Sequence, residues 1–123
     1  MAIVLQKDRR VADSILGRVF CDGRYYGDFS VDLGCHPTSS FEAGCYSLIN
    51  SIYSEDAVDV LDTKGRTVAT LTYRKPSVSK LCILVGQEGL TFRPCQRSFE
   101  AIKELYEGGS ARLVIREPLV MKA

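Results

Sequence analysis

Two short turns constrain the fold of this 123-residue chain more than any other feature. Asp22-Gly23 lies between the two arms of a hairpin predicted over residues 18–33, and its glycine supplies the positive φ angle that a two-residue hairpin turn needs. Gly65 suits the left-handed position of a type I turn with a bulge. That turn would join the arms of a second hairpin over residues 57–74 and place Asp62 opposite Arg66. Both patterns predict antiparallel strands.

In the second arm of the first hairpin, residues 29–33 alternate between apolar and polar side chains, which is typical of a half-buried strand. Two other segments predict additional strands. Residues 80–85, KLCILV, are apolar on both faces and predict a central strand. Residues 111–117, ARLVIRE, predict a last strand that is closed by Pro118.

Residues 39–53 predict an amphipathic helix. Ser39 and Glu42 fit a capping box, in which each side chain satisfies a free backbone N–H. The apolar residues fall on one helical face. That face comprises Phe41, Cys45, Leu48, Ile49 and Ile52. Burial in the core is therefore the expected fate of Cys45.

Two further helices follow from the same apolar spacing. Residues 8–16 predict a short helix that ends at Gly17. Residues 98–109 predict a second main helix with Ser98 as its N-cap. The predicted fold class is therefore α+β: an antiparallel β-sheet built from hairpins, with two main helices packed on it. Since no linker-like segment divides the chain, residues 1–123 are expected to form a single globular domain.

The first ten residues do not resemble a signal peptide, because the charges follow the apolar run rather than precede it. The longest apolar run, residues 81–85, is too short to span a membrane. We therefore expect a soluble cytoplasmic protein with no membrane partner. The five cysteines are widely scattered and include no CxxC pair, so free thiols are the simpler expectation.

Charge is segregated along the chain although the net charge is only +1. Residues 22–62 carry eight acids and one base, a net −7, and residues 63–99 carry seven bases and one acid, a net +6. One interpretation is a basic surface for a phosphate-bearing ligand, since arginine and lysine bind phosphates through charge-assisted hydrogen bonds. Its candidate residues are Arg74, Lys75, Lys80, Arg93 and Arg97. The alternatives are pairing of the charges across the sheet and self-association.

The first hairpin turn is followed by Arg24, Tyr25 and Tyr26, which form a second candidate binding site. Arginine and tyrosine are enriched where proteins contact partners, and aromatic rings stack on bases. Because neighbouring residues of a strand point to opposite faces, one tyrosine at most is expected to serve a given ligand.

Thiol chemistry is a third interpretation. The only histidine, His36, adjoins Cys35, and Cys45 follows nine residues later. A nucleophilic cysteine needs a base within hydrogen-bond reach, so His36 would have to supply it. A zinc site drawn from these residues lacks the usual ligand spacing. We therefore predict no metal and no cofactor.

These patterns favour a small non-catalytic binding or regulatory module that acts through a protein partner or through self-association as a homo-oligomer. One alternative is a binder of nucleic acid or nucleotide through the basic surface in residues 64–97. A second alternative is a thiol-dependent enzyme that uses Cys35 or Cys45 with His36.

Overall fold

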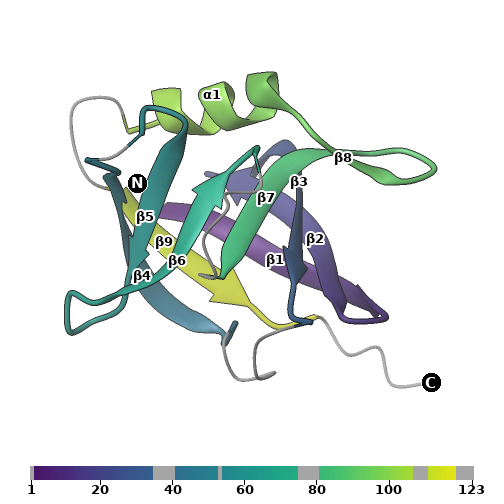
Figure 1. The fold of residues 1–123 in the computed structure, drawn as a ribbon, viewed down its shortest axis with the longest axis horizontal. Helices are drawn as coiled ribbons and strands as arrows, with labels where there is room; N and C mark the ends of the chain where they lie inside the picture. The colour runs from purple at the N-terminus through teal and green to yellow at the C-terminus, as the bar shows by residue number, and fades with distance from the viewer. Residues whose placement is uncertain (1, 35–40, 53, 75–80, 107–110, 119–123) are drawn as a thin grey trace.

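The computed structural model describes residues 2–34, 41–52, 54–74, 81–106 and 111–118. The described residues form a closed barrel of eight strands with one helix across an end (Figure 1). The elements are β1 (Ala2–Val11), β2 (Ser14–Cys21), β3 (Arg24–Asp32), β4 (Gly44–Asn50), β5 (Ala57–Leu61), β6 (Thr67–Thr72), β7 (Cys82–Glu88), β8 (Phe92–Pro94), α1 (Gln96–Glu104) and β9 (Ala111–Arg116).

The strand order around the barrel is β3-β2-β1-β9-β4-β5-β6-β7, and pairing of β7 with β3 closes the ring. The short strand β8 adds to β7 outside this ring. Two pairings are parallel, β1 with β9 and β6 with β7, and the others are antiparallel. Closure leaves no long unpaired sheet edge in the ring. It also inserts the late strand β9 between β1 and β4.

The predicted α+β fold with two main helices is wrong, because the described residues contain one helix, α1, and are otherwise mostly strand. Residues 8–16 lie in the β1–β2 hairpin instead of a helix. Its turn places Ala12 at a φ of 54°, a conformation that usually marks itself in a sequence by glycine. No helix in the described part of the chain has the length and apolar character needed to cross a membrane.

The helix predicted over residues 39–53 is also absent, and its described part contains β4. Leu48 is fully buried, whereas Ile49 is 38% exposed and Ile52 is 85% exposed, so the apolar face of the predicted helix does not exist. Backbone pairing with β5 on one side and β9 on the other overrides the helical spacing. Ser39, the proposed cap, lies outside the described residues.

Both hairpin turns are confirmed. Asp22 and Gly23 have φ angles of 51° and 79° between β2 and β3. In the second turn the Asp62 N–H donates to the Arg66 carbonyl oxygen at 2.9 Å, and the Arg66 Nε donates to Asp62 Oδ2 at 3.0 Å. The later helix is confirmed as well, although α1 begins at Gln96, two residues before the predicted Ser98 cap.

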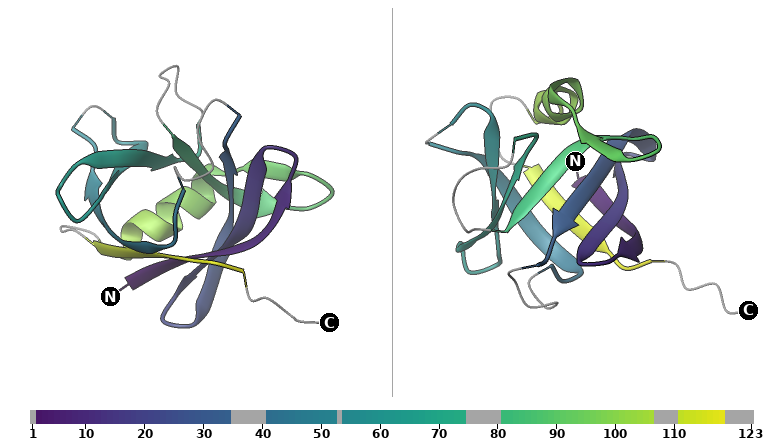
Figure 2. Two further views of the ribbon diagram at one scale, coloured as in Figure 1. Left: turned by 90° about the horizontal axis from the view of Figure 1, so that it is seen from below. Right: turned by 45° about the vertical axis from the view of Figure 1, so that its right-hand side comes forward.

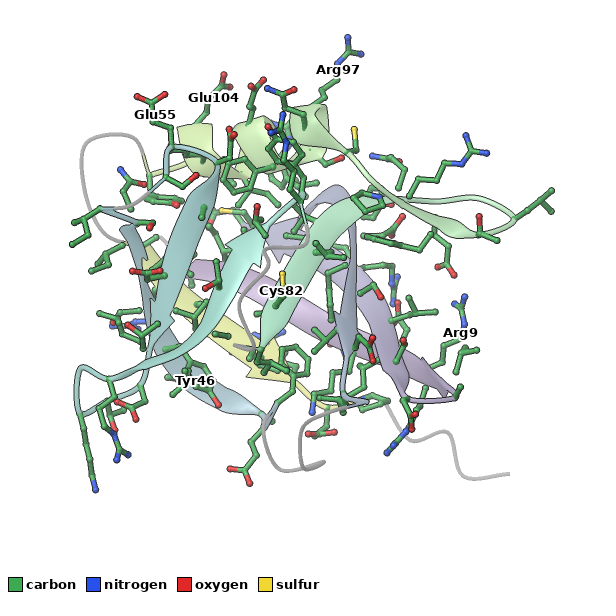
Figure 3. All side chains as sticks on the ribbon, in the orientation of Figure 1. Arg9, Tyr46, Glu55, Cys82, Arg97 and Glu104 are labelled. Carbon is green, nitrogen blue, oxygen red and sulfur yellow. The ribbon has the colours of Figure 1, made fainter. Side chains whose placement is uncertain are left out.

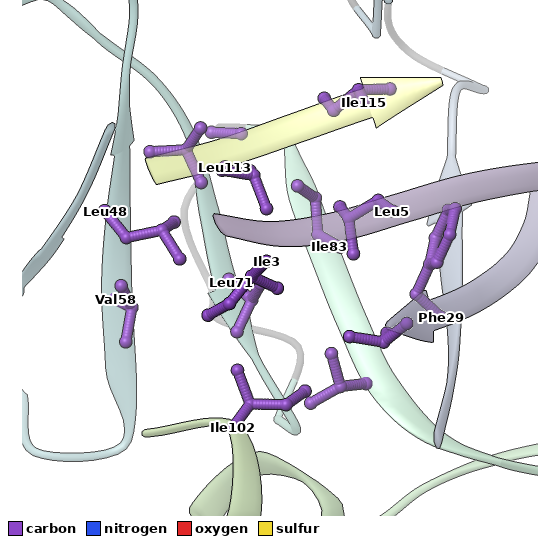
Figure 4. Packing of buried hydrophobic residues seen from close by; sticks show 14 of the residues in the cluster. Ile3, Leu5, Phe29, Leu48, Val58, Leu71, Ile83, Ile102, Leu113 and Ile115 are labelled. Carbon is purple, nitrogen blue, oxygen red and sulfur yellow. The ribbon is translucent and has the colours of Figure 1, made fainter. Parts of the chain in front are cut away.

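The hydrophobic core fills the inside of the barrel (Figure 4). Alternate residues of each strand point inward, and Ile3, Leu5 and Leu113 are fully buried. The apolar side of α1 closes one end, as seen through the ring of strands in Figure 2, left. The interior of an eight-stranded barrel is wide enough for side chains or for one small ligand, and here the buried core residues occupy it. A ligand site is therefore to be sought on the outer face.

Candidate functional site

The outer face of β1 carries a groove of about 580 Å³ between β2 and β9. We call it the outer groove. Its lining comes from β1, β2, the turn after β2, and the end of β9. The lining residues are Ala2, Val4, Gln6, Lys7, Asp8, Arg18, Phe20, Asp22, Gly23, Arg116 and Pro118.

Strand alternation explains why these side chains share one face. Ile3 and Leu5 point into the barrel, so Val4 and Gln6 point out. Val4 lies opposite Phe20 of β2. In the next outward row, Gln6 lies between Arg18 of β2 and Arg116 of β9. The register therefore places an aromatic ring and two guanidinium groups on adjacent strands.

Arg18 is held in place by an acid and an aromatic ring. Its Nε and Nη2 donate to the two carboxylate oxygens of Asp8 at 2.8 and 2.9 Å. The guanidinium carbon lies 5.3 Å from the centre of the Phe20 ring. The hydrogen bonds that Arg18 donates to Asp8 raise the pKa of Arg18, and burial opposes this. Arg18 and Phe20 thus form an ordered wall of the outer groove.

Arg116 provides a second cation in the outer groove. It is exposed and makes no ion pair with any residue that the structure describes. Beside it, the Gln6 Nε2 donates to the Glu117 carbonyl oxygen at 2.7 Å. Because its charge is not already matched in this part of the chain, Arg116 is available to an anionic ligand.

Lys7 contributes structure more than ligand-binding charge. It is 7% exposed. Its Nζ donates to the Phe41 carbonyl oxygen at 2.6 Å and to Glu117 Oε1 at 2.8 Å, and it lies 5.1 Å from the Phe41 ring centre. These contacts tie one end of the barrel to the segment after β9.

Tyr25 continues the aromatic surface beyond the outer groove, on β3. Its ring lies 6.1 Å from that of Phe20 in an edge-on arrangement and is 52% exposed. Its hydroxyl donates to Asp28 Oδ1 at 2.7 Å. Tyr26 is half-buried and packs against the core, and Arg24 is exposed beside the turn. Of the two tyrosines, Tyr25 is therefore the one accessible to a ligand.

Tyr25 is expected to ionise near pH 12. Burial, then the hydrogen bond to Asp28 and the charge of Asp28, raise its pKa from 10.0 to about 12. A raised pKa stabilises the folded state below pH 10, and this stabilisation is lost as the pH rises through the folded value. The measurement is the tyrosinate absorbance of the protein minus that of Tyr25→Phe. Asp28→Asn should lower the midpoint, and a wild-type midpoint near 10 would contradict the expectation.

The basic surface predicted from the sequence is not part of the outer groove. Arg93 lies on β8, and Arg97 extends from α1 away from the barrel (Figure 3). The Arg74 guanidinium carbon lies 5.2 Å from the centre of the Tyr73 ring at the end of β6. Lys75 and Lys80 lie outside the described residues. Three of the five predicted cations are thus placed, and none of the three lines the outer groove.

Among the described residues, few ion pairs join the acidic segment to the basic segment. Within the described ranges, Asp62–Arg66 is the ion pair that joins residues 22–62 to residues 63–99. The two residues are neighbours in one turn, so the pair contributes little beyond local order. The exposed large apolar side chains are distributed over several strands and turns. Single exposed apolar residues need no functional explanation.

Of the three residues proposed for thiol chemistry, Cys45 is the one that the structure describes. Cys35 and His36 lie outside the described residues. The expected burial of Cys45 is wrong, because Cys45 is exposed on β4. In the described part of the chain, no three histidine, cysteine or acidic side chains gather as a metal site would require.

Cys95 is a feature that the sequence interpretation overlooked. It is the N-cap of α1, and the pKa of its thiol is lowered by the backbone N–H and the hydroxyl of Ser98 and by Arg97. The helix was predicted to start at Ser98, so the cysteine before it carried no weight. A correct helix start would have indicated this polarised thiol.

The sequence interpretation also missed the outer groove, although the alternation of residues in β1 and β9 indicates which side chains face outward. Their alternation places Gln6 and Arg116 on outward positions, but only the parallel pairing of these distant strands makes them neighbours. The fold and the outer groove define a class: a closed eight-stranded β-barrel with a mixed aromatic and cationic outer face. Comparison with protein-family models, curated protein sequences and solved structures finds no match.

Proposed function

We propose that this protein is a non-catalytic binding module whose ligand carries a phosphate group and a planar ring, as a nucleotide does. The observation that carries the proposal is the outer groove, where Phe20 and Arg18 form one wall and Arg116 stands without an ion pair among the described residues. Aromatic faces accept bases, and guanidinium groups accept phosphates in bidentate geometry. A protein partner or self-association remains the competing proposal.

The arrangement of charges supports binding over reaction. Asp8 is committed to Arg18, and Lys7 is committed to Glu117 and to the backbone. Groups held in this way position neighbours, whereas a general base or nucleophile needs a free site for the substrate proton or the reacting atom. The carboxylate of Asp22, in the turn after β2, repels an anion at that end of the outer groove. The phosphate is therefore expected on the Arg116 side.

A binding titration with a panel of nucleotides at low salt tests the proposal. Phe20→Ala should weaken binding by roughly 5- to 150-fold, the range for losing one base–aromatic stack. Arg116→Glu should weaken it as well, because it reverses an exposed charge without removing a core contact. Both variants can be checked for folding by circular dichroism.

Arg97→Glu is the matched control, because it makes the same charge reversal on α1, outside the outer groove. It should leave the affinity unchanged. A loss with Arg97→Glu and none with Arg116→Glu would move the site to the basic segment. Absence of nucleotide binding at low salt would overturn the proposed function.

A further inference from the structure

We infer that the ligand is a single-stranded nucleic acid lying across the strands from β4 to β3, an inference that rests on the proposed function. The reason is that the outer groove is one part of a longer surface. Five outward residues face one another across neighbouring strands and form what we call the outer row. The outer row is Cys45, Val114, Val4, Phe20 and Tyr25.

The length of the outer row exceeds one nucleotide. Neighbouring strands lie about 4.8 Å apart, so four steps from β4 to β3 cover about 19 Å. The middle of the row is apolar and half-exposed at Val114, Val4 and Phe20. Its β3 end is the exposed ring of Tyr25. A chain of bases matches this succession of apolar and aromatic surfaces better than a single base does.

A second hollow, of about 320 Å³, extends the surface at the β4 end. Arg112 lines this hollow and lies opposite Ser47 of β4 and Ala2 of β1. Ala2 in turn lines the outer groove. Arg112 therefore stands between the two hollows on the outward side of β9, and a ligand that occupies both must pass it.

Cations flank the outer row on both sides. Arg112 lies two residues before Val114 on β9, and Arg116 lies two residues after it. Arg18 lies beside Phe20, but Asp8 matches its charge, so Arg112 and Arg116 are the two cations here that are open to a phosphate. A strand with bases along the row would have its phosphates at these flanking positions.

The acid that lines the same hollow as Arg112 already has hydrogen-bond partners. Asp62 accepts hydrogen bonds from the backbone N–H groups of Lys64 and Arg66, both at 2.9 Å, and from the Arg66 side chain at 3.0 Å. These backbone and side-chain hydrogen bonds lower its pKa, so it stays ionised and bound within its own turn. Arg112 is exposed and forms no ion pair in the described part of the chain.

The test measures affinity against length with oligo-dT and oligo-U of one to eight nucleotides. Affinity is expected to rise with length until about four nucleotides, at the short end of the range for single-strand-binding domains, and to fall steeply with salt. Comparison of the two series distinguishes DNA from RNA as the source of the ligand.

Arg112→Glu and Tyr25→Ala alter the two ends of the outer row. Each should weaken the binding of an eight-nucleotide strand by about tenfold, and Arg112→Glu, which lies outside the outer groove, should leave mononucleotide binding unchanged. Arg97→Glu should change neither. Both substituted side chains are exposed, so folding is expected to survive.

The outcomes separate the inference from the function on which it rests. Mononucleotide binding with no gain in affinity from length, or an affinity for the eight-nucleotide strand that Arg112→Glu leaves unchanged, would overturn the inference and keep the proposed function. No binding of any nucleotide or oligonucleotide would overturn both. An oligo-glutamate peptide that binds as tightly as the nucleic acid, with no effect of Phe20→Ala, would replace the nucleic acid by an acidic peptide.

Discussion

Replacement of Phe29 by alanine should lower the free energy of unfolding by about 3–5 kcal/mol. Phe29 is fully buried in the barrel and its ring centre lies 5.8 Å from that of Phe41. On the neighbouring strand it covers Gly17, where an added Cβ would lie 2.6 Å from the Phe29 ring. The fit of ring over glycine means that truncation leaves a cavity that no neighbouring side chain fills.

The measurement is equilibrium unfolding in urea. Leu90→Ala is the matched control, because Leu90 is fully exposed at the tip of the β7–β8 hairpin. Its removal should change stability by less than about 0.5 kcal/mol. A loss below about 1 kcal/mol for Phe29→Ala would show that the barrel interior is not packed as described.

Gly86→Ala should cost about 3 kcal/mol, near the upper end for overpacking a well-packed site. Gly86 pairs with Asp28 of β3 and with Pro94 of β8. A Cβ there would overlap the Arg93 carbonyl oxygen and lie 2.8 Å from Pro94 Cα. Because backbone atoms cannot rotate away as a side chain can, β8 would have to separate from β7.

Gly89→Ala is the control in the same hairpin. No heavy atom lies within 4 Å of a Cβ at that position, and its φ angle is not positive. The stability of the Gly89→Ala variant should therefore stay unchanged or rise slightly. The Cys95 N–H donates to the Val85 carbonyl oxygen at 3.0 Å, so its hydrogen exchange in Gly86→Ala reports directly whether β8 separates from β7. Equal stabilities of the two variants would contradict the close approach at Gly86.

Local patterns predicted those elements whose stabilising contacts are also local. The turn at Asp22-Gly23 needs a positive φ angle, and the Asp62–Arg66 turn is stabilised by its own hydrogen bonds. The apolar spacing predicted the helix over residues 96–104, although its N-cap is Cys95 and not the predicted Ser98. In each case the residues that determine the structure lie within a few positions of one another.

The predictions that failed concern segments with non-local partners. Residues 44–50 carry apolar residues that fit a helical period, yet β5 and β9 satisfy their backbone groups as a strand. The hairpin at Ala12 lacks a glycine, so its turn gave no signal. Intrinsic preference is a weak prior that tertiary pairing overrides, and this explains both errors.

The candidate site shows the same division. Tyr25 was identified from the sequence, because it follows a recognisable turn. Arg18, Arg116 and Phe20 were not, because each is an ordinary outward residue of its own strand. Their combination depends on β9 lying parallel to β1, across more than a hundred residues of chain.

Residue types and spacing were therefore sufficient for the turns, the later helix and the segregation of charge, which follow from neighbouring residues. Closure of the barrel determined the rest. It converted two predicted helices into strands, filled the interior with side chains, and brought the first and last strands, β1 and β9, together at the outer groove. The physical reason is that strand pairing satisfies backbone hydrogen bonds between segments far apart in sequence, so its outcome depends on the whole chain.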